Sequence, residues 1–528
     1  MNSIYLCDSL NRKRLALIFV TWAIVLAQAT LVCSCGKDLT EDMSLVGCDE
    51  QTVGPRLKSM EFRAKDNPLQ IVEDAQCEII GDSIVECWIR NIVSDKWLTA
   101  QFSIDGSVVA IDGASAVSGQ TVCDYGKPVT LTVASQGKSR TYKVYVHSFT
   151  GLPILWIETE GREGITSKED YLRAGFRLVE DLGTCSSAGV TEGTVYIRGR
   201  GNTTWDMPKK PYSLKFPQSV SLLGDPEERS WVLLANYADK TMLRHRTAFL
   251  MGQMSLLDYT PSSHFVELML NGNYEGTYLL SEKVTTGSHR VDVGKDGFLL
   301  EIDARADTCD VTFRTPHLEQ PVSIKKPSGI TLGDADYNYI RDYVTEAEKA
   351  LFSNDFTDRE KGWRAYMDMD SFVDWYLINE IARNTDACLY TSCDMHLSRG
   401  GKLKMGPLWD FDIAFGNADY ADGYHVDGFR IREATWFVRL FQDPAFVDRV
   451  RERFGYFLSR KADILRGINQ YAHDLRYAVQ ENDARWHTLY TYTWPNYNVW
   501  GSYQNEVQTM KEWLDARFKW LEREYSNL

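Results

Sequence analysis

The chain has 528 residues, more than one ordinary hydrophobic core accommodates, so the sequence predicts at least two domains. Its 44% hydrophobic and 12% aromatic content excludes a largely disordered protein. The formal net charge of −15, without any basic block, argues against nucleic acid as a partner.

The N-terminus has the pattern of an export signal. A cationic stretch at 12–14 precedes an apolar run over 15–32, which is followed by small residues and two cysteines. Cys35 is favoured as the lipidated cysteine because small Ser34 precedes it, whereas a bulky valine precedes Cys33. An uncleaved signal anchor is the alternative, because the charged and apolar regions are common to both.

We therefore expect a lipoprotein signal peptide over residues 1–34 and a polar tether over residues 35–56. A diacylated Cys35 would hold the mature chain stably on a membrane, because more than one acyl chain is buried. The expected location is the cell envelope, with the protein exported and lipid-anchored on the periplasmic or cell-surface side.

An all-β module is predicted over residues 57–150. Short segments rich in valine and isoleucine alternate with turn signals such as Gly81-Asp82 and Asp105-Gly106. Seven strands at this spacing favour an immunoglobulin-like β-sandwich, which would act as a spacer. The predicted strands are 59–63, 77–80, 83–89, 99–104, 108–111, 129–134 and 140–146.

The eleven cysteines are scattered and lack the dense spacing of a disulfide scaffold. A pairing of Cys77 with Cys87 across a hairpin stays open. A structural zinc site is not expected, because no cysteine pair with metal-ligand spacing is followed by a second such half.

Residues 151–528 read as a mixed α/β domain that begins with strands over 154–159 and 193–198. The second strand leads into a glycine-containing turn, Arg198-Gly-Arg-Gly-Asn-Thr-Thr-Trp205. Glycines permit close approach of the backbone to a ligand, so this turn could cradle phosphate groups. A structural hairpin with solvated cations is the plainer interpretation of the turn alone. The cations around it are Arg198, Arg200, Lys210 and Lys215.

A helix is predicted over residues 240–255, with Asp239 as its N-cap. A hairpin over 265–280 follows, and Asn271-Gly272 supplies its turn. The next strand, over 297–303, carries two carboxylates, Glu301 and Asp303.

The strongest chemical signal lies further along the chain. A helix over 370–383 runs directly into Asp386, and a hairpin over 388–408 then leads to Asp410 and Asp412. Phosphoryl transfer needs one carboxylate at the acceptor hydroxyl and others to hold Mg²⁺ on the nucleotide phosphates. Either motif alone also fits a helix cap or a turn; their order downstream of a cationic glycine turn favours catalysis.

These motifs resemble the CotH kinase family, which is known for spore-coat protein phosphorylation. The resemblance covers residues 152 to the C-terminus, and it implies a diverged protein-kinase-like, two-lobed α+β domain after the immunoglobulin-like sandwich. The motifs that carry it are Arg198-Gly-Arg-Gly-Asn-Thr-Thr-Trp205, Pro208-Lys-Lys-Pro-Tyr212, Asn236-Tyr-Ala-Asp-Lys-Thr-Met-Leu-Arg244, Gly276-Thr-Tyr-Leu-Leu-Ser-Glu-Lys-Val284, Asn384-x-Asp386 and Gly406-Pro-Leu-Trp-Asp-Phe-Asp412.

The resemblance implies roles for individual residues. Asp386 would be the catalytic-loop carboxylate, Asp410 the principal metal ligand and Asp412 its neighbour. Lys215 is preferred as the phosphate-contacting lysine, with Lys210 as the runner-up. Two arginines and one glutamate would complete the nucleotide site: Arg198, Arg200 and Glu282.

The sequence departs from typical kinases in three places. The glycine-containing turn over 198–205 is neither a Walker A loop nor a typical kinase glycine loop. The asparagine expected five residues after the catalytic aspartate is replaced by Thr391. The helix over 240–255 also contains no glutamate to pair with Lys215. Glu267 and Glu282 stay open as the partner of that lysine.

We expect an atypical serine/threonine kinase that uses ATP and Mg²⁺, with Mn²⁺ as an alternative metal. Its substrate would be a protein, and the acidic chain favours a basic one with Ser or Thr acceptors. ATP is scarce outside the cytoplasm, so another nucleotide donor or nucleotidyl transfer stays open. The rival hypothesis is a catalytically silent, kinase-derived surface binding or adhesion lipoprotein. A third hypothesis is a glycan-handling lipoprotein, because the fifteen tryptophans suit stacking on sugars, although most of them should belong to the core.

Overall fold

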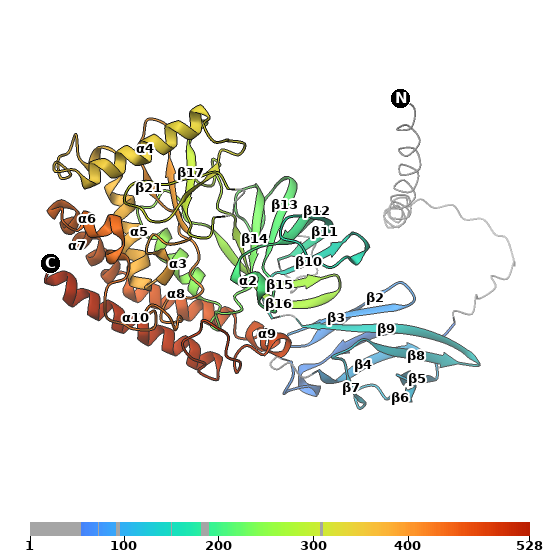
Figure 1. Ribbon diagram of the computed structural model, residues 1–528. Coiled ribbons are helices and arrows are strands. Elements are labelled where there is room, and N and C mark those ends of the chain that lie inside the picture. The colour runs from blue at the N-terminus through green and yellow to red at the C-terminus, as the bar shows by residue number, and fades with distance from the viewer. Residues whose placement is uncertain (1–53, 72, 91–95, 149, 181–188, 307–309) are drawn as a thin grey trace, which may run out of the picture. The chain divides into compact units, whose positions relative to one another are not determined.

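The computed structural model describes residues 54–71, 73–90, 96–148, 150–180, 189–306 and 310–528, and residues 54–528 form one compact unit (Figure 1). The expected signal peptide and Cys35 lie outside these residues. No helix in the described ranges combines the length and apolar character that crossing a membrane requires.

The N-terminal region is all-β. Its strands are hydrogen-bonded in the order β6-β5-β8-β9-β3-β2-β1-β4-β7, and the β3–β9 pair is parallel while the other pairs are antiparallel. All seven predicted strands are present, and two short ones, β6 and β7, add to them. The bounds are β1 Arg56–Phe62, β2 Ala75–Ile80, β3 Ile84–Ile89, β4 Trp97–Asp105, β5 Val108–Ile111, β6 Ala114–Ser115, β7 Val122–Asp124, β8 Val129–Ser135 and β9 Lys138–Ser148.

Alternating side chains explain why these segments form strands around one core. In β8, Val129, Leu131 and Val133 are buried while the residues between them are half-buried. Cys77 and Cys87 lie directly opposite each other on β2 and β3, and both are free thiols. The β-rich region is thus an added module, and its immunoglobulin-like identity stays a prediction.

A closed seven-stranded barrel follows, in the order β10-β11-β12-β13-β14-β16-β15. The pairing of β10 with β15 is parallel and closes it. Its interior is filled by alternate apolar side chains, including Leu214, Trp231 and Leu280. The bounds are β10 Ile154–Thr159, β11 Leu172–Val179, β12 Val190–Gly199, β13 Tyr212–Val220, β14 Glu228–Leu234, β15 Ser263–Leu270 and β16 Asn273–Glu282.

The outer face of the barrel joins a second, larger core. Val232 and Leu234 of β14 and Leu279 of β16 point away from the barrel interior and pack with helices and a further sheet. That sheet has the order β18-β19-β17-β20-β21. Its strands are β17 Phe298–Ile302, β18 Thr312–Phe313, β19 Val322–Lys326, β20 Cys393–Leu397 and β21 Lys404–Met405.

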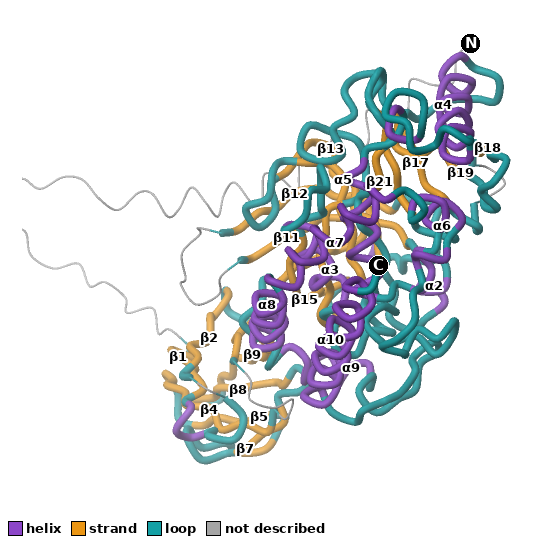
Figure 2. Tube along the Cα trace, turned by 90° about the vertical axis from the view of Figure 1, so that its left-hand side faces the viewer, coloured by secondary structure: helices purple, strands orange, loops and turns teal. Residues whose placement is uncertain are grey.

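Helices make up most of the C-terminal part, and α8 and α10 lie beside each other in both views (Figures 1 and 2). Helix α5 is buried from Ser371 to Ala382 and forms the centre of the large core. The helices are α2 Thr203–Asp206, α3 Arg244–Gln253, α4 Ala335–Phe352, α5 Met369–Ala382, α6 Thr435–Leu440, α7 Pro444–Ser459, α8 Lys461–Asp474, α9 Ala478–Trp486 and α10 Tyr503–Ser526.

The mixed α and β composition confirms the predicted class, and one local detail differs. Helix α3 begins at Arg244, four residues later than expected, because Asp239 accepts hydrogen bonds from the amides of Thr241 and Arg244 and holds the intervening turn. The turn at Asn271-Gly272 is confirmed, since both residues have positive φ, 51° and 82°.

Candidate active site

Asp410 and Asp412 follow β21 in a loop that is anchored on both sides. Ser392 Oγ donates to Asp410 Oδ2 at 3.0 Å, and the Phe411 amide donates to His245 Nε2 of α3 at 3.2 Å. Asp410 has φ 64°, a left-handed conformation that aspartate tolerates better than most residues. Phe411, between the two aspartates, is buried and anchors the loop in the core. This anchor fixes the positions of Asp410 and Asp412 on either side of Phe411 in the chain.

Asp386 lies in a single 3₁₀ turn directly after α5. Tyr420 donates its hydroxyl proton to Asp386 Oδ1 at 2.8 Å. Asn384 Nδ2 donates to the Asp410 carbonyl at 3.2 Å, which ties the turn to the loop after β21. The structure therefore brings Asp386 and Asp410 together, as the order of the sequence motifs predicts.

The three aspartates influence one another's charge. Burial raises the pKa of Asp386, its bond from Tyr420 opposes that rise, and the charge of Asp410 adds to it. Burial and the neighbouring carboxylates of Asp410, Asp239 and Asp386 raise the pKa of Asp412 to about 8. The mutual repulsion of these carboxylates would be relieved by a positive charge nearby.

Arg200 is the cation that the structure brings to this group. It lines a cavity of 40 Å³ together with Asp410 and Asp412, and its guanidinium lies 5.5 Å from the centre of the Trp409 ring. Burial lowers the pKa of Arg200, and the carboxylates of Asp410, Asp412 and Glu301 act in the opposite direction. The glycine turn therefore places Arg200 at the cavity that Asp410 and Asp412 line from the loop after β21.

Lys209 lines the same cavity and is almost fully buried. Its Nζ donates to Asn482 Oδ1 at 2.8 Å and also to the Thr277 carbonyl. Burial lowers the pKa of Lys209 to about 7. No local pattern marks Lys209 as a site residue, because a lysine in a Pro-Lys-Lys-Pro run gives no signal of burial.

Lys283 is a second cation that the sequence analysis missed. Its amide donates to the Ser230 carbonyl, and Ser230 is paired with Lys215 on β13, so the two lysines lie on one face of the sheet. Burial, together with the charges of Arg198, Arg200 and two further lysines, lowers the pKa of Lys283 to about 8. Lys283 thus lies inside the cationic group, whereas Lys215 is exposed on the same face.

Three other predicted residues have structural partners instead. Lys210 donates to the Trp205 carbonyl at 2.6 Å, and Arg198 donates to carbonyls of the 168–169 loop. Glu282 pairs with Arg290 and accepts from the Tyr259 hydroxyl at 2.7 Å. Glu282 therefore does not provide the expected carboxylate for Lys215.

Glu267 does not provide that carboxylate either. It is buried in the barrel wall and accepts from Thr150 Oγ1 at 2.6 Å and from the Tyr274 hydroxyl at 2.7 Å. The carboxylate that does approach a lysine near the site is Glu301, whose Oε2 is 3.1 Å from Lys325 Nζ.

The five-stranded sheet adds carboxylates close to the site. Glu301 of β17 lies directly opposite Asp394 of β20. Burial, followed by the charge of Glu301, raises the pKa of Asp394 well above its usual value. Thr391, at the position where typical kinases have asparagine, donates to Asp303 Oδ1. Asp303 thus adds a carboxylate at the position where the sequence departs from the kinase pattern.

The carboxylates suit a hard cation without enclosing one. Among the residues that the structure describes, no group of three or more Asp, Glu, His or Cys side chains is arranged to hold a metal ion. Mg²⁺ commonly binds one or two carboxylates and completes its shell with water and phosphate oxygens. Asp410 and Asp412 fit that arrangement as oxygen donors.

The glycines of the cationic turn serve packing as well as approach. A Cβ at Gly199 would lie 2.3 Å from the Trp205 ring, and Gly201 has φ 85°. Helix α2 carries Trp205 back over the turn. Gly199 is required because the indole ring occupies the space of its missing side chain.

Comparison with known proteins identifies a family. Residues 197–521, more than half of the chain, match the family described as CotH kinase protein. Among the curated proteins, none matches this chain. One solved structure, described as a "putative glycoside hydrolase" from Bacteroides thetaiotaomicron, is 17% identical and has a TM-score of 0.17. That alignment covers 35% of this chain and 54% of the other, and it is too weak to support an argument.

Proposed function

The chain belongs to the CotH kinase protein family, and from this premise we propose that it is an atypical, kinase-like phosphotransferase. It transfers a phosphoryl group from ATP, or from another nucleotide donor, to Ser or Thr hydroxyls of an exported or surface protein. The barrel corresponds to the smaller lobe of a diverged kinase fold, and the five-stranded sheet with its helices corresponds to the larger lobe.

One observation carries the proposal: Arg200 and the Asp410–Asp412 pair line the same cavity, and Asn384 connects this pair to the turn that bears Asp386. Phosphoryl transfer depends on positioning and on charge stabilisation by such groups. A purely structural loop gains little from several half-buried carboxylates beside a half-buried arginine, because desolvation of each charge is costly.

In this proposal, Asp386 orients the acceptor hydroxyl and receives its proton as the oxygen–phosphorus bond forms and the bond to the nucleotide breaks. Asp410 and Asp412 would hold Mg²⁺ or Mn²⁺. When bound, the metal ion offsets the negative charge of the phosphates. Arg200 and Lys283 contact the phosphates, and Lys215 extends the cationic face outward.

Nucleotide binding tests this function directly. The thermal unfolding of residues 54–528 is measured with ATP, with and without Mg²⁺, for the wild type and for Asp410→Asn. Asparagine keeps the shape of the side chain and tolerates the left-handed backbone, so the substitution removes mainly the charge. We expect a Mg²⁺-dependent rise in Tm that Asp410→Asn abolishes and that Asp427→Asn, an exposed loop control, retains.

Two outcomes would contradict the proposal. If no nucleotide raises the Tm of the wild type, the chain is better described as a kinase-derived binding or adhesion module. If Asp386→Ala, which we expect to bind nucleotide and to lose transfer, keeps wild-type transfer, Asp386 is not the catalytic carboxylate.

The proposed location is the cell envelope, with a lipid on Cys35 as the anchor. Outside the cytoplasm ATP is scarce, so the donor that the site accepts is part of the question. The same thermal measurement with other nucleoside triphosphates and with diphosphates identifies that donor.

A further inference from the structure

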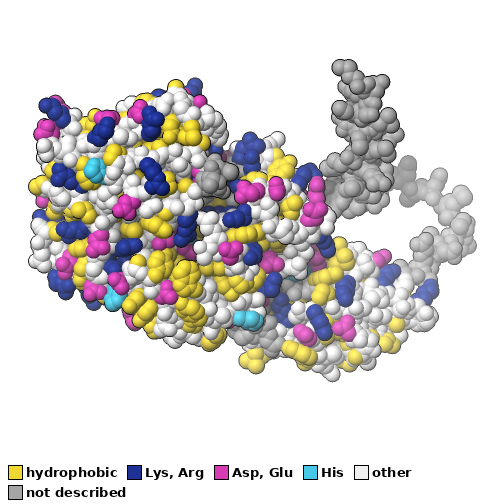
Figure 3. All heavy atoms as spheres, in the orientation of Figure 1, with side chains coloured by type: hydrophobic (Ala, Val, Ile, Leu, Met, Phe, Trp, Pro, Cys, Tyr) yellow, Lys and Arg dark blue, Asp and Glu magenta, His cyan; other side chains and the backbone are white. Residues whose placement is uncertain are grey.

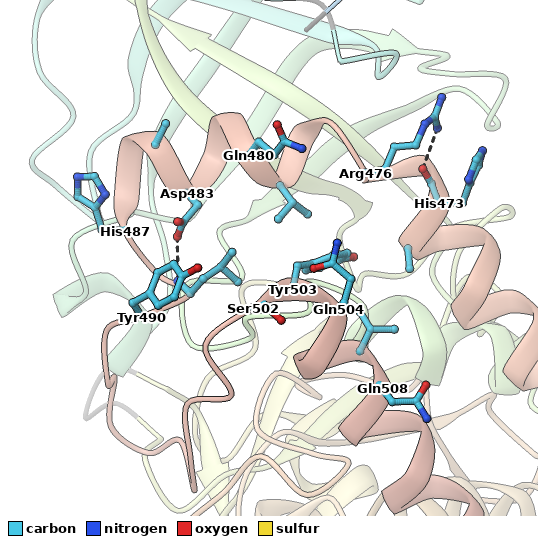
Figure 4. A pocket seen from close by; sticks show the side chains of 15 residues that line it. His473, Arg476, Gln480, Asp483, His487, Tyr490, Ser502, Tyr503, Gln504 and Gln508 are labelled. Carbon is cyan, nitrogen blue, oxygen red and sulfur yellow. Dashed lines mark hydrogen bonds between the residues drawn. The ribbon is translucent and has the colours of Figure 1, made fainter. Parts of the chain in front are cut away.

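A second cleft lies among α8, α9 and α10, and it shares no lining residue with the cavity around Asp410. Its volume is 670 Å³, within the range of small-molecule sites. In the close-up, Gln480 and Asp483 approach it from one helix, Gln504 and Gln508 from another, and Tyr490 stands at one end (Figure 4).

The cleft is close to electrically neutral. Its lining includes one arginine, Arg476, and one carboxylate, Asp483, besides two histidines. Arg476 Nη1 donates to the His473 carbonyl at 2.8 Å, and Asp483 Oδ1 accepts from the Leu489 amide at 2.8 Å. Both charges already have protein partners, so the cleft offers little to a nucleotide or to a strongly charged peptide.

Uncharged hydrogen-bonding groups dominate the polar lining. Gln480 of α9 and Gln504 of α10 both line the cleft, and no hydrogen-bond partner within the described chain engages the side-chain amide of either one. Gln508 Nε2 donates to Glu512 Oε1, and the side-chain carbonyl oxygen of Gln508 is left available. Each amide offers both a donor and an acceptor, which is the pattern that sugar hydroxyls require.

An aromatic segment continues from the mouth of this cleft. Tyr490 is 73% exposed, and between residues 491 and 500 four more large aromatic residues are each at least 39% exposed. So many exposed rings in a short segment indicate a binding surface rather than scattered apolar residues. The remaining four are Tyr492, Trp494, Tyr497 and Trp500.

This segment reaches the candidate active site. Trp494 stacks on Tyr420 with ring centres 6.2 Å apart, and Tyr420 donates to Asp386. Over the described part of the face in Figure 3, positive and negative side chains are interspersed among hydrophobic ones. A ligand that follows the aromatic segment would therefore extend from the neutral cleft toward Tyr420, beside the turn that carries Asp386.

We propose that the cleft and the aromatic segment bind a neutral saccharide chain. The C–H faces of sugar rings pack against flat aromatic rings such as Tyr490, while their hydroxyls pair with the amides of Gln480 and Gln504. This binding activity goes beyond phosphotransfer and does not depend on it. Combined with the proposed phosphotransfer, on which this one consequence rests, saccharide binding would hold the phosphoryl acceptor near glycan, either on a glycosylated protein or beside a cell-surface polysaccharide.

Calorimetric titration tests the proposal. Residues 54–528 are titrated with uncharged hexasaccharides: α-1,4- and β-1,4-linked glucose, β-1,4-linked N-acetylglucosamine and α-linked mannose. We expect at least one of these hexasaccharides to bind with a Kd below about 1 mM. Tyr490→Ala and Gln504→Ala each weaken that binding about tenfold, which corresponds to the loss of about 1.4 kcal/mol.

The controls separate this site from the catalytic one. Gln470→Ala, an exposed glutamine of α8 outside the cleft, keeps wild-type saccharide affinity. Asp410→Asn also keeps it, whereas Tyr490→Ala and Gln504→Ala keep the Mg²⁺-dependent rise in Tm with ATP. The proposal is overturned if none of the hexasaccharides binds, or if both cleft variants bind as the wild type does.

Discussion

Two opposing influences act on the pKa of Asp386. Burial raises its pKa, and the hydrogen bond from Tyr420 lowers it. Tyr420 is itself held in place by stacking on Trp494. Tyr420 therefore acts as a positioning residue that favours the ionised form of Asp386 while orienting it.

Replacing Tyr420 by phenylalanine should shift the pH dependence of phosphotransfer. Without the hydroxyl, the ionised form of Asp386 loses a hydrogen bond, so its pKa rises. Activity that needs the ionised carboxylate is present above this pKa and is lost as the pH falls through it. The acid limb of kcat therefore moves to higher pH in Tyr420→Phe.

The measurement is kcat across the pH range at saturating nucleotide. Tyr424→Phe is the control, because Tyr424 stacks on Tyr497 and not on a residue of the site. An unchanged acid limb in Tyr420→Phe would show that the bond does not set the ionisation of Asp386.

At the scale of elements, the turn between β12 and β13 is organised by one packing contact. Gly199 ends β12, and α2 brings the Trp205 ring against it. Lys210 donates to the Trp205 carbonyl and lies 5.4 Å from the centre of its ring. This packing holds the turn in the shape that directs Arg200 toward Asp410 and Asp412.

Gly199→Ala should destabilise residues 54–528 by about 1–3 kcal/mol, since the new methyl group overpacks against the indole. Displacement of the turn should also weaken Mg²⁺-dependent ATP binding, because Arg200 follows directly. Urea unfolding and the thermal shift measure the two effects.

The matched control is Gly175→Ala in β11, where an added Cβ meets no atom within 4 Å. The free energy of unfolding of Gly175→Ala should stay close to that of the wild type. If Gly199→Ala also behaves in this way, the indole moves aside at little cost and does not define the turn.

Across the whole molecule, one buried ion pair connects segments that are far apart in sequence. Arg517 of α10 and Glu380 of α5 are fully buried, with 2.7 Å between Nη2 and Oε1. The Glu380 carboxylate also accepts from the amides of residues 430–432. Arg430 in turn donates to the Thr385 carbonyl beside Asp386. The C-terminal helix thereby supports the turn that carries the proposed catalytic carboxylate.

Arg517→Met should lower the free energy of unfolding by about 3–5 kcal/mol, because Glu380 is left as a buried charge without its cation. The loss is measured by urea unfolding, and Arg523→Met, at an exposed position of the same helix, should change it little. Equal stability of the two variants would mean that the pair contributes nothing beyond its surroundings.

The proposed membrane anchor is also a property of the whole molecule. Cys35→Ala should release the full-length protein from the membrane fraction, because it removes the site of lipidation. Cys33→Ala should stay bound. If Cys35→Ala remains in the membrane fraction after cell lysis, an uncleaved signal anchor holds the chain instead.

Local patterns determined much of this protein by sequence alone. Period-two alternation predicts the seven longer strands of the β-module, and helical spacing predicts α5 to within one residue at each end. The order of helix, Asp386, hairpin, Asp410 and Asp412 predicts their convergence, because a short hairpin returns the chain to its starting point. These features depend on neighbours in sequence, so sequence suffices.

Tertiary structure decided which charged side chains share a site. The sequence favours Lys215 as the phosphate ligand because this lysine follows the glycine turn, yet Lys283 lies inside the cationic group and Lys215 lies at its exposed edge. Glu301 meets Lys325, while Glu282 meets Arg290. Burial and long-range pairing depend on how barrel, sheet and helices pack, and no local pattern encodes that packing.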